Sequence, residues 1–596
     1  MGCQKSDCFS IYRQRIASLW FLLVTLIGLG SPVLGNERPN VLFIAVDDLR
    51  PSIGCYGDKL AITPNMDRLA SRGLQFDRAY CQVAVCNPSR ASLMTGLRPD
   101  NLGVWTLPIH FREAKPDAIT MPQWFRKHGY TAVSHGKIFH NPTPDPQSWS
   151  EPIRPLSGLP YPYPRGTRDR IRSVDRSLPA NDWRKNILRG PIAASPEIAD
   201  HRMLDGARTD MAIQDLRRLA KSEKPFFLAM GYIRPHLAWI SPKKYWDMHD
   251  RKKFPTRRDE KVNPNTPRYA MFSNREMAHY VDLAEFPEPW DKEKPSAEKV
   301  QYLLHAYYAC VSYVDAQIGR LLKALEDEGL ADNTIVVLWS DHGWKLGEYS
   351  AWGKRTNYEI DTRVPLIISA PGMKHTGKRT NQLVELLDLY PTLCDLAGID
   401  IPQFVDGKSL RPVLNDIDKP IHEGATSQYY RRDGEQEYMG YAIRTDRYRY
   451  VEWRDFQSGA VRARELYDHR SDPNEKKNIA ATASSEQIQV LVAKLLKTHP
   501  RKKLNLVPMI HSSPEPGRMR VGLTFSNETE TTLLLNLIQS SGRRAWKLRA
   551  VKRVKPGEKL AFDEAKLGDV YVVESVDGKH YEIHSPAYPR KVVTIK

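Results

Sequence analysis

The run Asn40-Val41-Leu42-Phe43-Ile44-Ala45-Val46, followed at once by Asp47-Asp48, indicates the class of fold more directly than any other segment. It is continuously β-branched, aromatic and aliphatic, which is typical of a strand that is buried on both faces of a parallel sheet. We expect similar strands at Thr131–Ser134, Pro225–Met230, Thr334–Trp339 and Pro365–Ser369.

Helical segments separate the predicted strands, and the clearest begins after Ser296. Ser296 is a typical N-cap residue, apolar residues recur at helical spacing from Val300 to Leu325, and Gly329 ends the helix. Strands that alternate with amphipathic helices predict an α/β sheet covered on both faces. Ligands of such folds bind at the carboxyl ends of the strands.

The first residues read as a secretory signal peptide. Arg13 and Arg15 precede the apolar stretch Ile16–Leu29, and the small residue Gly35 offers a cleavage site. A membrane anchor needs about 20 apolar residues, and glycines and a proline interrupt this stretch too early. We expect no stable membrane span, and a secreted or periplasmic protein, or a lysosomal one in a eukaryote.

The chain of 596 residues is too long for one core. Residues 145–295 are rich in Pro, Arg and Asp and read as long surface loops over the site, whereas strands and a final helix follow from about residue 420. Short strands with Gly turns close the chain. The expected division is a signal peptide (1–35), a catalytic domain (36–415), an α+β subdomain (416–503), a linker (504–518) and a small β-sandwich accessory domain (519–596).

The chain is basic, with a formal net charge of +18 at pH 7. Such an excess favours polyanionic partners, including sulfated polysaccharide, nucleic acid and acidic cell surfaces, although solubility alone is a simpler explanation. No zinc-finger spacing, RNA-binding aromatic motif or basic zipper accompanies the charge, so nucleic acid is not the expected partner. The sequence does not indicate an oligomeric state.

Cys86 carries the strongest functional signal. It opens the string Cys86-Asn87-Pro88-Ser89-Arg90, with Thr95-Gly96 close behind. Five cysteines remain after the predicted signal peptide, and an odd number in an exported protein points to one thiol with another fate. The simpler alternative is a small buried cysteine before a turn.

Two acidic segments follow predicted strands, Asp47-Asp48 and Asp341-His342. Adjacent carboxylates are most often a solvated turn or a helix cap. Two such strand ends that meet at one edge of a sheet would instead make an oxygen-rich site for a hard cation, Ca²⁺ or Mg²⁺. Zinc is less well matched, because no cysteine pair or His-x-His cluster is present.

The Cys86 string resembles the recognition sequence by which type I sulfatases convert a cysteine to formylglycine (3-oxoalanine). The hydrated aldehyde carries two hydroxyls on one carbon, so one can attack sulfur and the other can then expel sulfate, which a thiol could not do. The resemblance implies an alkaline-phosphatase-like α/β fold, with a smaller C-terminal α+β subdomain and an appended all-β domain. It also implies the maturing enzyme, a formylglycine-generating enzyme, as a partner.

The same resemblance implies the roles of the site residues. One Ca²⁺ would be held by Asp47, Asp48, modified Cys86, Asp341 and His342, where His342 replaces the more usual Asn. Arg90 would hold the modified residue, and Lys137 and Lys354 would bind sulfate oxygens. His236 would protonate the leaving oxygen and His140 would take the second hydroxyl's proton, although these two roles could be exchanged. Without the family, each of these basic residues is an ordinary surface charge or core imidazole.

Further motifs resemble the iduronate-2-sulfatase branch of the family. They include Gly136-Lys137-Ile138-Phe139-His140, Arg234-Pro235-His236 and the segment from His342 to Glu348. The resemblance covers roughly residues 38 to 480 and is weakest in the 145–295 loops. We therefore expect a hydrolase that removes sulfate from a sulfated polysaccharide or glycosaminoglycan fragment. The alternatives are a phosphoester or phosphonate hydrolase on the same scaffold and a non-catalytic binder of sulfated glycans.

Overall fold

The computed structural model describes residues 38–140, 144–154, 163–258, 265–283 and 285–501, and, near the carboxyl end, strands between 520 and 595 together with Lys555. The predicted signal peptide and linker lie outside the described residues, as does part of the proline-rich stretch near residue 160. Within the described part of the chain, no helix has the length and apolar character that a bilayer-spanning segment needs.

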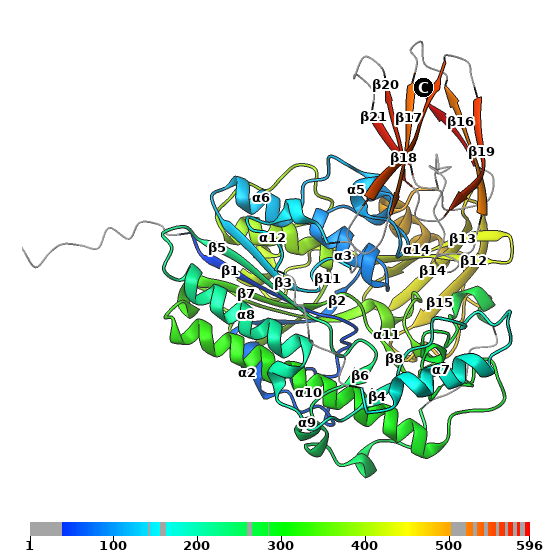
Figure 1. Cartoon of the computed structure of the whole chain (residues 1–596). Coiled ribbons are helices and arrows are strands. Elements are labelled where there is room, and N and C mark those ends of the chain that lie inside the picture. Colours follow the sequence, from blue (N-terminus) through cyan, green and yellow to red (C-terminus); the bar gives the residue numbers. More distant parts are fainter. Residues whose placement is uncertain are drawn as a thin grey trace, which may run out of the picture.

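A seven-stranded sheet with the order β11-β2-β10-β7-β1-β5-β3 forms the centre of the molecule (Figure 1). The predicted strands are confirmed, with ends that differ by up to two residues. They are β1 (Asn40–Val46), β3 (Thr131–Gly136), β5 (Phe226–Tyr232), β7 (Thr334–Ser340) and β10 (Arg363–Ser369). β1 pairs in parallel with both β5 and β7, so their carboxyl ends share one edge.

The other half of the sheet departs from the prediction of a parallel sheet. β10 runs antiparallel to both of its neighbours, β7 and β2 (Leu74–Tyr80). β2 and the edge strand β11 (Lys378–Glu385) were not predicted. β11 begins with polar residues and is half exposed, and β2 carries Asp77 and Arg78 in its middle, so neither is the uniformly apolar run that marks a buried strand.

Helices cover both faces of the sheet, as expected. Alternate residues of β1 face opposite layers: Leu42 and Ile44 join the core with α2 (Pro64–Arg72), α8 (Leu204–Leu219) and α10 (Ala297–Asp327). Val41 and Phe43 face the other core, which includes α3 (Cys86–Thr95), α6 (Met121–Lys127) and α12 (Leu389–Leu396). This alternation follows from the two-residue period of a strand.

The long helix α10 begins and ends close to the predicted residues. The Ser296 side chain accepts a hydrogen bond from the backbone N–H of Lys299, so it is the N-cap. The helix ends at Asp327, and Gly329 follows in the left-handed region at φ +70°.

The region 145–295 contains more regular structure than its weak periodicity predicted. Besides β5 and α8 it holds α7 (Thr167–Ser177), α9 (Lys243–Asp247) and the short strands β4 (Ala193–Ala194) and β6 (Trp239–Ile240). Besides several 3-10 helices, the short elements before residue 416 include α4 (Pro99–Leu102), α5 (Phe111–Ala114), β8 (Lys345–Leu346), β9 (Trp352–Gly353), α11 (Glu359–Thr362) and α13 (Arg411–Asn415).

The part after residue 420 forms an antiparallel sheet with one helix, as predicted. The strands follow one another in order as β12 (Ala425–Asp433), β13 (Gln436–Arg444), β14 (Tyr448–Asp455) and β15 (Val461–Asp468), and α14 (Ser485–Thr498) packs against them. β12 also lies beside the central sheet, because Gln428 donates its backbone N–H to Gln82.

The residues expected to be all-β contain strands and no helix among those described. One sheet has the order β19-β16-β22 and the other β18-β17-β20-β21. The strands are β16 (Arg520–Asn527), β17 (Leu533–Ser540), β18 (Trp546–Val554), β19 (Lys559–Lys566), β20 (Val570–Ser575), β21 (Tyr581–His584) and β22 (Lys591–Ile595). The boundaries of all the predicted domains stay predictions.

Candidate active site

Polar side chains gather at the carboxyl ends of two neighbouring strands. Asp47 and Asp48 follow β1, and Asp341 and His342 follow β7. Because β1 and β7 are parallel neighbours in register, these residues reach the same edge of the sheet. The backbone N–H of Asp48 donates to Asp341 Oδ1 over 3.2 Å, so the structure brings the two acidic strand ends together.

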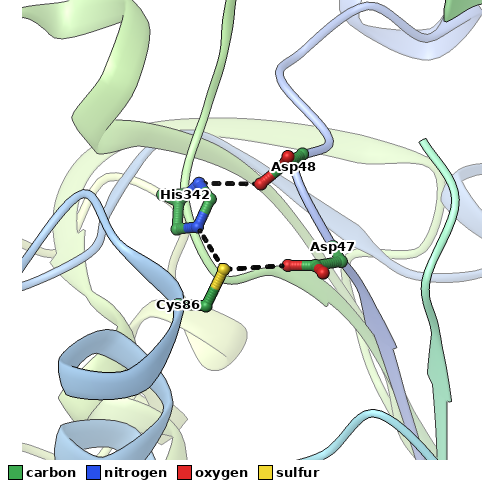
Figure 2. A group of neighbouring side chains, drawn as sticks. All are labelled: Asp47, Asp48, Cys86 and His342. Carbon is green, nitrogen blue, oxygen red and sulfur yellow. Dashed lines mark hydrogen bonds and ion pairs between the residues drawn. The ribbon is translucent and has the colours of Figure 1, made fainter. Parts of the chain in front are cut away.

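Cys86 lies against this cluster, at the first residue of α3 (Figure 2). Its Sγ is 3.4 Å from Asp47 Oδ1 and 3.2 Å from His342 Nε2, while His342 Nδ1 is 3.5 Å from Asp48 Oδ1. Burial and the charge of Asp47 raise the pKa of the Cys86 thiol to about 12. An unmodified thiol held here would stay protonated and therefore be a poor nucleophile.

Four donor atoms of this cluster could hold a divalent cation. One atom each from Asp47, Asp48, Cys86 and His342 lie within 4.8 Å of one another, and all four residues are buried. Asp48 Oδ2 is buried and accepts no hydrogen bond from any described residue. A buried oxygen without a donor fits a cation ligand, since leaving such an atom unpaired is costly.

The two adjacent carboxylates have opposite electrostatic environments. Burial raises the pKa of Asp48, and the charge of Asp47 adds to this against the opposing effect of Lys354. Burial acts on Asp47 in the same direction, but the charges of Lys137 and Arg90 oppose it, and the pKa of Asp47 is lowered. Asp48 also adopts a left-handed backbone at φ 60°, a strained conformation that is common at functional sites.

Arg90 lies one helical turn beyond Cys86 and connects the carboxylates of Asp47 and Asp341. Its Nη2 is 3.2 Å from Asp47 Oδ1 and its Nε is 2.8 Å from Asp341 Oδ2. Its Nη1 donates to the backbone carbonyls of Lys137 and Ile138. Arg90 is fully buried, so this guanidinium fixes the relative positions of the two acidic strand ends.

Two buried lysines approach Cys86. Lys137 Nζ lies 3.6 Å and Lys354 Nζ 3.7 Å from Cys86 Sγ. Lys137 pairs with Asp47, and Lys354 Nζ lies 2.5 Å from Asp48 Oδ1. Burial alone would lower the pKa of both lysines, but the neighbouring carboxylates raise it. Both ammonium groups therefore stay charged beside residue 86.

The two predicted histidines lie within the field of these lysines. His236 Nε2 is 4.0 Å from Asp48 Oδ2, and its Nδ1 lies 2.8 Å from the carbonyl of Leu237. Burial, with the charge of Lys354, lowers the pKa of His236, and burial with the charge of Lys137 lowers the pKa of His140 to about 3. Both imidazoles are thus neutral, and a bound anion would favour their protonation by offsetting the lysine charges.

Two charged residues of the site carried no recognisable sequence signal. Glu276 Oε1 lies 3.7 Å from His236 Nε2 and 3.9 Å from Lys354 Nζ, although Glu276 comes from the region read only as surface loops. Burial would raise the pKa of Glu276, but the charge of Lys354 opposes it and the pKa is lowered. Arg355 follows Lys354 directly, and its backbone N–H donates to the carbonyl of Ala84, two residues before Cys86. The sequence analysis named neither residue.

Comparisons with known families and proteins identify similar chains over most of the length. The family profile described as Sulfatase matches residues 39–399, and the one for the C-terminal part of N-sulphoglucosamine sulphohydrolase matches residues 347–502. Iduronate 2-sulfatase of Homo sapiens is 34% identical over 543 residues, covering 77% of this chain and 96% of that protein. A sulfatase of Formosa agariphila is 33% identical over 475 residues, covering 78% of this chain and 87% of that protein.

Solved structures share the fold. One, in complex with its substrate D-glucosamine-2-N,6-O-disulfate, has a TM-score of 0.61 at 25% identity and covers 79% of this chain and 99% of its own. The phosphonate monoester hydrolase of Agrobacterium radiobacter has a TM-score of 0.57 at 24% identity, covering 77% of this chain and 95% of its own. The arrangement of strands and helices thus agrees with the predicted alkaline-phosphatase-like fold.

Proposed function

This chain belongs to the sulfatase family and hydrolyses sulfate esters of sulfated sugars, and we propose that its site is built on residue 86 as formylglycine beside one Ca²⁺ ion. The observation that carries the proposal is the set of groups around Cys86 Sγ. Asp47, His342, Lys137 and Lys354 all lie within 3.7 Å of this atom.

The donor set fits the two groups that the proposal requires. Asp47, Asp48 and His342 would hold the cation together with an oxygen of modified residue 86, and Asp341 would complete the set from its position beside Arg90. Bound there, the cation would supply positive charge that favours an ionised hydroxyl. The hydrated aldehyde would supply the attacking hydroxyl and the second hydroxyl that later releases sulfate.

The protein's own residues would position the ester and balance its charge. Lys137, which pairs with Asp47, and Lys354, which pairs with Asp48, would bind two sulfate oxygens and stabilise charge as it moves to the leaving oxygen. Arg90 would keep Asp47 and Asp341 at a fixed separation. This preorganisation matters because rigid dipoles and charges need no rearrangement during the reaction.

The histidines would move protons. His236 would give a proton to the sugar oxygen as it leaves, and His140 would take one from the second hydroxyl. Glu276 Oε1 lies 3.7 Å from His236 Nε2, and a carboxylate at this distance favours the protonated imidazole. This contact supports His236, and not His140, as the general acid.

The proposed substrate is a sulfated uronic acid in a glycosaminoglycan-like saccharide, on the strength of the similarity to iduronate 2-sulfatase. We also propose the predicted domain division, with a signal peptide at residues 1–35, an exported enzyme and an accessory β-domain at residues 519–596. A formylglycine-generating enzyme would act on the chain before it folds around buried Cys86.

The test is sulfate release by protein co-expressed with a formylglycine-generating enzyme. The peptide that contains residue 86 is analysed by mass spectrometry, and sulfate is measured from a panel of sulfated saccharides with calcium present. We expect release in proportion to the modified fraction. Equal release by unmodified protein would overturn the nucleophile, and no release from any sulfate ester would overturn the function.

The second candidate is a phosphonate or phosphoester hydrolase, since phosphonate monoester hydrolases share the fold. Phosphate and sulfate esters are both tetrahedral, but a phosphate monoester carries more negative charge. Parallel assays with an aryl sulfate, an aryl phosphate and a phosphonate monoester separate the candidates. We expect the aryl sulfate to have the highest kcat/KM.

A further inference from the structure

Arg355 is a charged side chain at the site that the proposed reaction does not use. It follows Lys354, and its backbone N–H donates to the carbonyl of Ala84 over 3.1 Å, two residues before Cys86. Its backbone is held in the left-handed region at φ 79°. The loop after β9 is therefore attached to the strand-to-helix turn that presents residue 86.

The guanidinium of Arg355 forms no ion pair with any described residue, and its Nε is buried without a hydrogen-bond partner among them. It lies over the ring of Phe272, 4.9 Å from the centroid. Burial alone would lower the pKa of Arg355, but the neighbouring groups Tyr429 and Glu276 raise it. A buried donor without an acceptor is costly unless a ligand supplies the acceptor.

A second arginine beside the same Phe272 ring, Arg431, has hydrogen-bond acceptors for its guanidinium. Arg431 lies over the same Phe272 ring, also at 4.9 Å, and over Tyr429 at 4.5 Å. Unlike Arg355, it donates to backbone carbonyls, those of Tyr269 and Arg355. Arg431 thus supports the loop, whereas Arg355 keeps its donors available. Tyr429 packs with Val83 and Val85, which places this aromatic and arginine group beside the start of α3.

We infer that Arg355 forms a second anion-binding subsite next to the sulfate site, which takes a carboxylate or a second sulfate of the same saccharide. The inference deepens the proposed function and rests on it. An arginine fork matches the two oxygens of either group, and the Phe272 ring keeps its plane oriented. The enzyme would therefore prefer sulfate esters that carry another negative group to singly charged ones.

The experiment compares substrates in the full-length, modified enzyme. Arg355→Gln is assayed with a 2-sulfated uronic acid, with a disulfated glucosamine and with an aryl sulfate that has a single negative charge. We expect kcat/KM to fall about 10- to 100-fold for one or both doubly charged sugars and less than about threefold for the aryl sulfate. Loss on the uronic acid alone identifies a carboxylate subsite, and loss on the disulfated sugar alone identifies a sulfate subsite.

Two further variants separate binding from folding. Arg355→Lys keeps the charge but not the fork and should give an intermediate loss, and it tolerates the same backbone conformation as Gln. Arg432→Gln, an exposed arginine on β12, is the matched control and should change nothing. Equal losses on all three substrates, or no loss on any, would overturn the subsite.

A binding measurement distinguishes this inference from the proposed function. In Cys86→Ser protein, calorimetry with the sulfated uronic acid and the disulfated glucosamine should show binding that Arg355→Gln weakens about tenfold or more. That result would support the subsite even if no sulfate is released. Binding that Arg355→Gln leaves unchanged, or no binding of either sugar, would contradict it.

Discussion

Glu465 on β15 should make the stability of the protein depend on pH near neutrality, and Glu465→Gln should remove this dependence. The carboxyl is buried, accepts hydrogen bonds from Trp453 Nε1 at 2.6 Å and Tyr467 Oη at 2.5 Å, and has its pKa raised by burial from 4.5 to about 7. Tyr467 Oη also lies 3.3 Å from Tyr358 Oη, in the segment that follows Lys354.

The direction follows from the raised pKa. Below pH 4.5 the Glu465 carboxyl is protonated in both the folded and the unfolded protein, so its ionisation does not lower the free energy of unfolding. Between pH 4.5 and 7 the unfolded chain releases the proton while the folded protein keeps it, and folding becomes less favourable as pH rises. Raising the pKa from 4.5 to about 7 corresponds to about 3 kcal/mol of folding free energy. The folded protein loses this amount in full above pH 7.

The assay is thermal unfolding of wild type and variant from pH 5 to pH 8. The melting temperature of Glu465→Gln relative to wild type should rise across this range by a few degrees. Glu452→Gln on β14 is the control with the opposite sign, because Arg501 and Arg454 outweigh the effect of burial and lower the pKa of Glu452. That variant should be less stable than wild type by a constant amount from pH 5 to pH 8. A constant difference for Glu465→Gln as well would refute the reasoning.

Three further predictions concern the site. Cys86→Ser should abolish sulfate release in a host that modifies only cysteine, and turnover by purified variant would contradict the nucleophile. Asp341→Asn should lower bound divalent metal and activity together, because Asp341 accepts the backbone N–H groups of Asp48 and His342 and pairs with Arg90. The control for the metal analysis is Asp315→Asn, a buried carboxylate that accepts the backbone N–H of Met66 instead. Unchanged metal content in Asp341→Asn would refute the prediction. Lys354→Met should lower kcat/KM for aryl sulfate about 10²- to 10³-fold while exposed Lys323→Met does not, and a loss below tenfold would exclude a role in charge stabilisation.

Local patterns predicted those parts of the protein whose physical cause lies within a short segment. β1 was predicted because a strand buried along its whole length has a nearly continuous apolar sequence. α10 was predicted because its apolar spacing and its Ser296 cap act within a few turns. The Cys86 string indicated the proposed chemistry because the recognition sequence of a modifying enzyme is a local sequence pattern. The two acidic strand ends followed from one further rule, that parallel strands place their carboxyl ends at one edge.

The direction of β10 and the existence of β11 depend on contacts between segments that are far apart in the sequence. β10 is as apolar as a parallel strand, and only its connections to β7 and β2 decide that it runs antiparallel. β11 is a strand because it pairs with β2. Its own polar composition does not indicate a strand.

The sequence by itself determined the α/β class and the two acidic strand ends, which meet beside Cys86. Only the tertiary structure decided that Glu276 reaches His236 and that Arg355 remains without an anionic partner among the described residues. The reason is that charge and hydrogen-bond complementarity act through space. Neither side chain has a neighbour in sequence that reveals what lies across the site.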